Sequence, residues 1–179
     1  MLITTLPSWL EAINTEPRRF RDESDAMRFV VSLSRKNIAD GGGPFSAAVL
    51  DEHLNLVSAG VNRVVPAGLS MLHAEMVALM LAQKKLRTHD LASCGSYRLI
   101  SSCEPCAMCL GAIPWSGVDR VVCGARAADA EAIGFDEGAK PARWMEELER
   151  RGITVVSDVL RDDAVSVLTQ YENMQGRIY

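Results

Sequence analysis

The sequence has no stretch with the pattern of a targeting or membrane segment. Residues 1–19 lack the basic start and apolar region of a signal peptide, and no apolar run approaches the roughly 18 residues that cross a bilayer. Internal repeats and low-complexity stretches are also missing. We therefore expect a chain that is neither exported nor held in a membrane, with the cytoplasm as its location.

The chain also lacks an excess of positive charge. Nineteen Lys and Arg stand against 23 Asp and Glu, a formal net charge of −4, whereas a polyanion-binding surface needs a basic excess. Nucleic acid is therefore not an expected partner. With 48% hydrophobic and 23% charged residues, the composition is that of a globular protein rather than a disordered or fibrous chain.

A single domain accounts for the length without disulfides. A chain of 179 residues falls in the usual domain range and can bury roughly 70% of its unfolded surface. The cysteines are odd in number, and four of them fall within sixteen consecutive positions. They are Cys94, Cys103, Cys106, Cys109 and Cys123. This set favours a reducing compartment and a metal or reactive thiol over a secreted disulfide framework.

Hydrophobic periodicity and turn signals predict strands that alternate with helices. Strands are expected at 45–50, 56–61, 98–101, 120–123 and 153–156, and helices from Ser24 to 40, at 73–86 and 105–115, around Trp144 and from Arg161. The first two strands flank a turn and indicate a β-hairpin. The order β, β, α, β, α, β through the central region predicts an α/β fold.

Two motifs at the starts of predicted helices carry the residue types of a zinc site. Cys106 and Cys109 are three residues apart in a first helical turn, so both can face one ion, and the helix amino terminus favours their thiolates. His73, at the start of the other helix, supplies a nitrogen ligand. Three protein ligands leave one tetrahedral position open, as in catalytic zinc sites. We expect one zinc per chain.

Glu75 distinguishes a catalytic site from a structural one. Two thiolates formally cancel the charge of Zn²⁺, so a nearby carboxylate is needed to take a proton from the attacking water. On a regular helix, residues i and i+2 point about 200° apart, so this role requires His73 to lie in an irregular first turn. The alternative is a non-catalytic domain with a closed Cys₃His site that includes Cys103, in which Glu75 has no use.

The pattern His73-Ala74-Glu75 followed by Pro105-Cys106-x-x-Cys109 resembles the zinc-dependent nucleobase and nucleoside deaminases. The similarity covers roughly residues 24–125. It implies the cytidine deaminase-like fold, a three-layer α/β/α arrangement with a mixed sheet of about five strands. We expect this domain to span residues 1–179, with the carboxy-terminal segment completing the pocket.

The same resemblance assigns roles to the motif residues. It implies that His73, Cys106 and Cys109 bind zinc and that Glu75 shuttles protons, while Cys103 lies outside the matching pattern. Related deaminases commonly form homodimers, and in some the carboxy-terminal segment crosses to the partner's site. We expect a homodimer here as well, and the exchange of that segment stays open.

Guanine deaminases and tRNA adenosine deaminases share the matching stretch. The expected carboxy-terminal helix has no basic cluster for a tRNA stem, because Arg161 and Arg177 are mixed with acidic residues. The region 131–138 and the terminal Tyr179 are similar to bacterial guanine deaminases. In that group an asparagine before the zinc core and a carboxylate after it hold the purine, and we place these roles on Asn62 and Glu137.

The hydrogen-bonding edge of guanine supports this choice. Guanine presents N1–H and the 2-amino group as adjacent donors, which one carboxylate can accept together, whereas adenine has a lone pair at N1. Phe45, Trp115, Phe135 and Tyr179 are candidates to contact the planar ring. We expect hydrolytic deamination of guanine to xanthine and ammonia, with Glu75 and Glu137 as catalytic carboxylates. Adenosine deamination in tRNA is the alternative activity.

Overall fold

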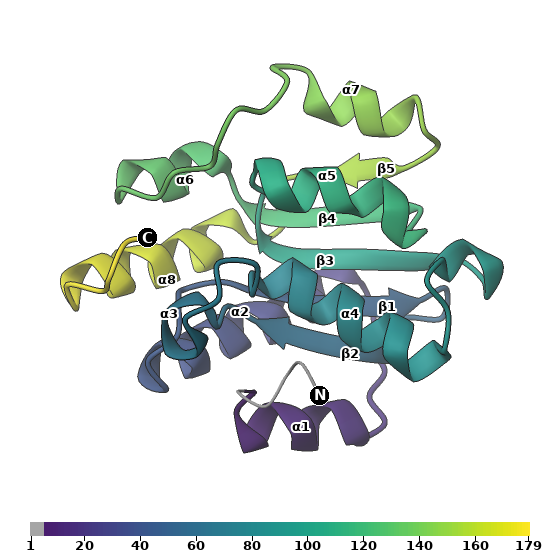
Figure 1. Cartoon of the computed structure of the whole chain (residues 1–179), viewed down its shortest axis with the longest axis horizontal. Helices are drawn as coiled ribbons and strands as arrows, with labels where there is room; N and C mark the ends of the chain where they lie inside the picture. Colours follow the sequence, from purple (N-terminus) through teal and green to yellow (C-terminus); the bar gives the residue numbers. More distant parts are fainter. Residues whose placement is uncertain (1–5) are drawn as a thin grey trace.

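A five-stranded mixed sheet organises residues 6–179, which the computed structural model describes; residues 1–5, the start of the expected domain, lie outside the described part (Figure 1). The strand order is β2-β1-β3-β4-β5. The strands are β1 (Ser46–Asp51), β2 (Leu56–Val61), β3 (Tyr97–Cys103), β4 (Arg120–Ala125) and β5 (Thr154–Val156). β1 pairs antiparallel with β2 and β3, whereas β3, β4 and β5 run parallel.

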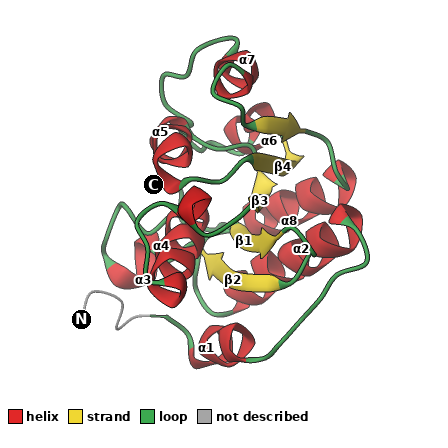
Figure 2. Ribbon diagram, turned by 90° about the vertical axis from the view of Figure 1, so that its right-hand side faces the viewer, coloured by secondary structure: helices red, strands yellow, loops and turns green. Residues whose placement is uncertain are grey.

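Helices cover both faces of this sheet, so the chain has the expected three-layer α/β/α fold (Figure 2). The main helices are α2 (Glu23–Ala39) and α8 (Arg161–Asn173) on one face and α4 (Ala74–Leu86) and α5 (Ala107–Ser116) on the other. Shorter helices are α1 (Ser8–Thr15), α3 (Val64–Ala67), α6 (Ala127–Ala132), α7 (Trp144–Glu149) and the 3₁₀ turn Leu91–Ser93. None of the described helices is long and apolar enough to cross a membrane.

The strand residues alternate between two apolar cores. Ala48 and Ile100 point into the core beneath α2 and α8, while Val49 and Leu99 point into the core beneath α4 and α5. This period of two lets each strand bury side chains on both faces. The short strands β1 to β4 are therefore almost wholly buried at the centre of the fold.

Four chain segments meet at one edge of the sheet. Ser46 at the start of β1 pairs with Val61 at the end of β2, and Ala47 pairs with Ser101 near the end of β3. The carboxyl end of β4 lies beside that of β3 because the two run parallel. The connections that precede β1 and follow β2, β3 and β4 are thus neighbours, as is usual for ligand sites in α/β sheets.

The predicted hairpin and central helices are confirmed, with small shifts at their ends. The first long helix begins at Glu23 rather than at Ser24, and Asp22 is its cap. Asp22 adopts an extended backbone (φ −158°, ψ 177°) and its carboxylate accepts a hydrogen bond from the Asp25 amide at 2.7 Å. An ionised carboxylate at this position satisfies a free amide and faces the positive end of the helix, so Asp22 is the favourable cap.

Candidate active site

His73 lies immediately before α4 rather than inside it. Its backbone is extended (φ −67°, ψ 155°), and its carbonyl accepts the first helical hydrogen bond, from Val77 at 3.0 Å. Because His73 precedes the helix, the rotation of about 200° between helical positions i and i+2 does not apply to it. The side chains of His73 and Glu75 can therefore face the same side. Both side chains line one pocket at the edge of the sheet.

The two cysteines of the second motif complete a cluster with His73. Cys106 is the residue before α5 (φ −66°, ψ 172°), and Cys109 lies in its first turn. The Cys106 sulfur is 3.5 Å from His73 Nδ1, and the three ligand atoms lie within 4.8 Å of one another. Tetrahedral Zn–N and Zn–S bonds of about 2.0 and 2.3 Å require ligand separations of roughly 3.4–3.8 Å. These residues therefore fit one zinc ion.

The electrostatics of the cluster suit a cation. Hydrogen bonding with Cys109, together with His73, lowers the pKa of the Cys106 thiol to about 4. The hydrogen bond with Cys106 and the burial of the side chain together raise the pKa of the Cys109 thiol. Burial and the charge of Cys106 raise the pKa of Glu75, whose side chain is 6% exposed. A carboxyl group with a raised pKa beside such a cluster is suited to carry protons near neutral pH.

Cys103 does not join this cluster. It ends β3, and its thiol donates to the Arg126 carbonyl at 3.5 Å. Burial raises the pKa of this thiol well above its usual value. Within residues 6–179, the group that can hold a metal consists of His73, Cys106 and Cys109. The geometry therefore favours an open three-ligand site over the closed Cys₃His alternative.

The pocket beside the cluster is lined by residues from all parts of the chain. They are Phe45, Asn62, His73, Glu75, Cys103, Glu104, Cys106, Phe135, Asp136, Glu137 and Tyr179. Two buried polar atoms in this wall have no hydrogen-bond partner among the described residues: Glu137 Oε2 and the Tyr179 hydroxyl. Buried polar atoms are normally paired, so this wall is built for a polar ligand.

Glu137 reaches the pocket on a tightly fixed loop. Its carbonyl accepts a hydrogen bond from the Ala107 amide at 2.9 Å, at the start of α5. Gly138 follows with φ +71°, and a Cβ there would lie 2.9 Å from that of Ala107. Glycine is therefore needed for the close approach. Burial raises the pKa of Glu137 to about 7.

The backbone of Asn62 is fixed by a hydrogen bond from Asn37, a buried residue that the sequence analysis missed. The Asn37 side chain donates to the carbonyls of Gly43 and Asn62, both at 2.8 Å. Asn62 itself is 1% exposed, and its side chain caps the turn by accepting from the Val64 amide at 3.2 Å. A Cβ at Gly43 would collide with the Tyr179 hydroxyl and lie 2.9 Å from Asn62 Oδ1. This glycine leaves room for two polar side chains at the pocket.

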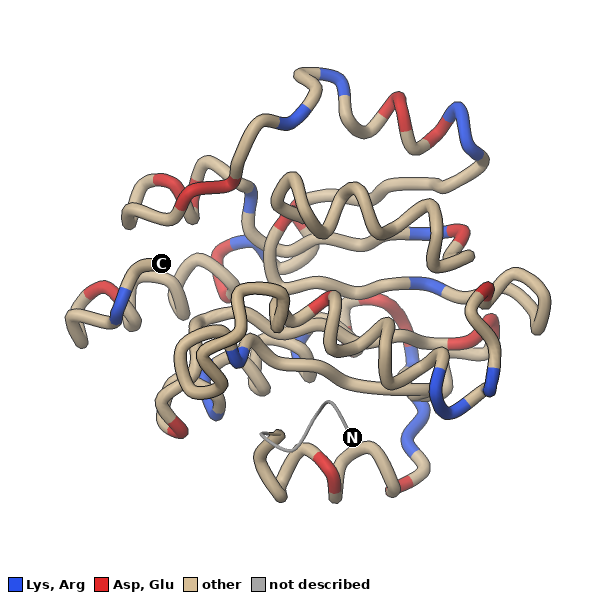
Figure 3. Tube along the Cα trace, in the orientation of Figure 1, with Lys and Arg blue, Asp and Glu red and all other residues tan. Residues whose placement is uncertain are grey.

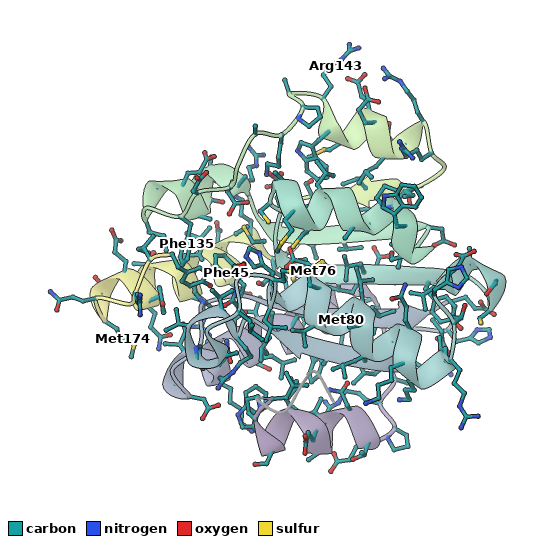
Figure 4. All side chains as sticks on the ribbon, viewed as in Figure 1. Phe45, Met76, Met80, Phe135, Arg143 and Met174 are labelled. Carbon is teal, nitrogen blue, oxygen red and sulfur yellow. The ribbon has the colours of Figure 1, made fainter. Side chains whose placement is uncertain are left out.

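The carboxy-terminal segment folds back onto the pocket of its own chain. The Tyr171 hydroxyl donates to the Arg177 carbonyl at 2.8 Å, which turns the last residues back along α8. Phe135 contacts Phe45, Tyr171 and Tyr179 with ring centroids 4.9, 6.0 and 5.3 Å apart. The neighbouring positions of Phe45 and Phe135 are visible in Figure 4. Tyr179 thereby closes one side of the pocket.

The structure does not bring Trp115 to this pocket. Its side chain is 81% exposed, near the far end of α5, in a groove shared with Pro141 and Trp144. Nine residues of helix separate it from Cys106, which is about 13 Å along the axis. We therefore remove Trp115 from the ring-contacting candidates. Phe45, Phe135 and Tyr179 do line the pocket.

Glu104 and Lys140 are further residues at the site that sequence reasoning missed. The Glu104 carboxylate accepts from the Ala127 amide at 3.0 Å and so joins the start of α6 to the loop after β3. Lys140 lies 3.7 Å from Glu137. The position of Glu104 directly before the Pro105-Cys106 pair was an available signal, whereas Lys140 has none besides its nearness to Glu137 in the sequence.

A His/Cys/Cys cluster beside a buried carboxylate, at the end of an α/β sheet, defines the site of a zinc-dependent hydrolase. Residues 21–125 match the cytidine and deoxycytidylate deaminase zinc-binding region, and the chain belongs to this family.

Solved structures resemble nearly the whole chain. One is NE0047 in complex with 2,6-diaminopurine, which is 51% identical over 97% of this chain and 94% of that chain, with a TM-score of 0.94. Another is guanine deaminase from Nitrosomonas europaea, 50% identical over 94% of each chain, with a TM-score of 0.92. Guanine deaminase from Bacillus subtilis is 36% identical over 62% of this chain and 69% of its own length. Deaminases of other substrates are also among the relatives at 33% identity, so the substrate needs its own argument.

Proposed function

We propose that this protein is a zinc-dependent guanine deaminase that converts guanine and water to xanthine and ammonia. The observation that carries this proposal is the free Oε2 atom of Glu137, buried in the pocket wall without a hydrogen-bond partner. An acceptor in that position matches the adjacent N1–H and 2-amino donors of guanine. Adenine would place a lone pair against it.

The relatives support the same substrate class. The Nitrosomonas guanine deaminase is similar over almost the whole chain, including the segments after residue 125 that supply Phe135, Glu137 and Tyr179 to the pocket. The ligand of NE0047 is a purine with amino groups at positions 2 and 6. Its 2-amino group is one of the two donors that we assign to Glu137, whereas its N1, like that of adenine, carries a lone pair.

Each polar residue has a distinct part in the proposed reaction. Zinc, when held by His73, Cys106 and Cys109, supplies a Lewis acid that makes water nucleophilic near neutral pH. Glu75 accepts a proton from the attacking water and passes it to the ring nitrogen beside C2. Glu137 accepts hydrogen bonds from the base edge, and its pKa of about 7 suits a second proton transfer to the departing ammonia.

The remaining wall residues hold the base. Asn62 both donates and accepts, so it reads the other polar atoms of the purine. Phe45, Phe135 and Tyr179 pack against the flat ring. In this proposal the carboxy-terminal segment completes the pocket of the same chain, because Tyr179 fills the position beside Gly43.

Charge argues against a tRNA substrate. Lys and Arg are distributed over many elements and interspersed with Asp and Glu (Figure 3). The net charge is −4, and α8 begins with Arg161, Asp162 and Asp163. Strong binding to a tRNA stem would need clustered cations that displace counterions. The site therefore suits a free base.

One assay tests the proposal directly. Ammonia release is measured from guanine, adenine, cytosine, guanosine and an adenosine-34 tRNA with the zinc-loaded protein. We expect turnover of guanine alone, with a rate that changes less than about twofold on adding salt to physiological strength, because no counterions are released. Inosine formation in the tRNA would reassign the substrate, and absence of turnover on every amine would support the structural zinc hypothesis.

The proposal includes a homodimer in a reducing compartment such as the cytoplasm. All five cysteines are free, and three of them are buried. The outer side of α4 carries the half-buried Met76 and Met80 (Figure 4), and Trp115 is exposed on the neighbouring α5. A second copy would cover such an apolar face. Sedimentation equilibrium should give twice the mass of the chain, and Trp115→Glu should weaken the association.

A further inference from the structure

Lys140 is a largely buried cation on the loop that carries Glu137. Its ammonium group donates to the Pro105 carbonyl at 2.9 Å and lies 3.7 Å from Glu137 Oε2. The side chains of Lys140 and Glu137 are only 11% and 7% exposed. On the other side, the ammonium lies 5.9 Å from the centre of the Trp144 ring. Lysine is rarely buried to this degree unless it is paired, and here its partners are the Pro105 carbonyl and the Glu137 carboxylate.

Lys140 compensates the charge of the Glu137 carboxylate without donating a hydrogen bond to it. Its short hydrogen bond goes to Pro105, the residue before the ligand Cys106. The separation of 3.7 Å from Glu137 is too long for a hydrogen bond, so Oε2 keeps its capacity to accept. A positive charge at this distance still offsets part of the cost of burying a carboxylate.

The loop that carries Glu137 makes a second hydrogen bond with the start of α5. The Glu137 carbonyl accepts from the Ala107 amide at 2.9 Å. Lys140 and the Glu137 backbone thus form hydrogen bonds with Pro105 and Ala107, the residues on either side of Cys106. The position of the Glu137 carboxylate relative to the metal ligands is set by these two contacts.

We propose that Lys140 is a positioning residue of the active site: it holds the Glu137 carboxylate against the pocket and compensates its charge while leaving Oε2 free for the substrate. This inference rests on the proposed guanine deaminase function. Lys140 does not touch the substrate and acts only through Glu137. A lysine that merely stabilised the loop would not depend on that carboxylate.

A double-mutant cycle distinguishes the two roles. In zinc-loaded protein, Lys140→Met should lower kcat/KM for guanine at least about tenfold, because the carboxylate loses its compensating charge and its orientation. In the Glu137→Gln background, the same change should cost less than about threefold. Lys140→Arg keeps the charge and should lose less than Lys140→Met. Arg143→Met, on the same segment but 69% exposed, is the matched control and should leave turnover unchanged.

A second double-mutant cycle uses urea unfolding to measure the coupling between Lys140 and Glu137 without substrate. Lys140→Met should lower the midpoint of urea unfolding in the parent and lower it less in Glu137→Gln, because only the parent is left with an uncompensated buried carboxylate. If Lys140→Met does not fold, Lys140→Gln replaces it, since its amide can still donate to Pro105. The same pattern of losses is expected for it.

The outcomes separate this inference from the proposed function. Equal losses of kcat/KM in both backgrounds, or no loss in the parent, overturn the positioning role. If the parent releases no ammonia from guanine, the proposed function fails by itself, and the urea cycle still decides whether Lys140 and Glu137 are coupled. Coupling in both cycles supports the assignment.

Discussion

The active site has two halves that are built in different ways. The metal half, with His73, Glu75, Cys106 and Cys109, lies on the starts of α4, which packs on β1 and β2, and of α5, which packs beside α4. The base half uses a turn after β2, the loop 134–138 and the last residue of the chain. The metal half depends on local spacing, whereas the base half depends on tertiary contacts that span most of the sequence. The halves should therefore respond differently to substitution.

The largest effect is expected where a metal ligand is removed. Cys106→Ala should lose stoichiometric zinc and all measurable turnover, because two remaining ligands bind zinc weakly. Cys103→Ala is the matched change three residues earlier, and it should keep one zinc per chain because its thiol bonds to Arg126 instead. Metal analysis after dialysis measures both. Zinc retained in the first variant and lost in the second would move the site towards Cys103.

Glu75→Gln should have the next largest effect and should leave the metal in place. The change keeps the volume of this buried side chain and removes its ability to carry a proton. Loss of a general acid–base group typically costs about 10²–10⁴-fold in rate. Ammonia release in single-turnover experiments and zinc content should be measured on the same sample. Parental turnover in this variant would mean that the site is structural.

The contrast between the halves also explains what the sequence could predict. The proposed zinc ligands and Glu75 follow from residues spaced by two and three positions at helix starts, and the structure places His73, Cys106 and Cys109 in one cluster. The strands and central helices follow from periodic apolar residues. Asn37 and Lys140 could not be found this way, because their roles depend on carbonyl groups of Gly43, Asn62 and Pro105 that only the folded chain brings near. The prediction for Trp115 was wrong for a different reason: its type suits a ring contact, but its place nine positions beyond Cys106 on α5 puts it far from the pocket.

In the base half, Glu137→Gln should reduce guanine turnover at least about fivefold while zinc stays bound. The new amide places a donor against a donor of the substrate, and one mispaired buried polar group costs about 1–3 kcal/mol. Glu131→Gln, an exposed change on the neighbouring α6, is the control and should be neutral. Values of kcat/KM for guanine should be compared between the two variants. Equal activity would show that the loop does not read the base.

Two glycine substitutions compare how each half tolerates added volume. Gly176→Ala places a Cβ against the Tyr171 ring, so it should displace the terminal segment and Tyr179. A loss of about 1 kcal/mol of ring contact would raise KM for guanine roughly fivefold. Gly111→Ala, on the metal-bearing α5, has no atom near the added Cβ and should leave KM unchanged. A similar rise in KM in both variants would contradict the expectation that the metal half and the base half respond differently to substitution.

The smallest effect concerns stability rather than turnover. Burial raises the pKa of Glu137 to about 7, from 4.5 in a solvated carboxyl group. The folded protein therefore holds this proton more tightly than the unfolded chain does. The resulting stabilisation is fully present below pH 4.5 and is lost as the pH rises through 7.

Glu137→Gln cannot titrate at this position, so the difference in unfolding free energy between parent and variant isolates the carboxyl group. The parent should lose about 1–3 kcal/mol relative to the variant between about pH 4 and 8, and the difference should stay constant above about pH 8. Urea unfolding of both zinc-loaded proteins across this range measures the difference. A parent that gains stability relative to the variant as pH rises would mean that Lys140 and its surroundings more than offset burial, and that Glu137 is ionised well below neutral pH.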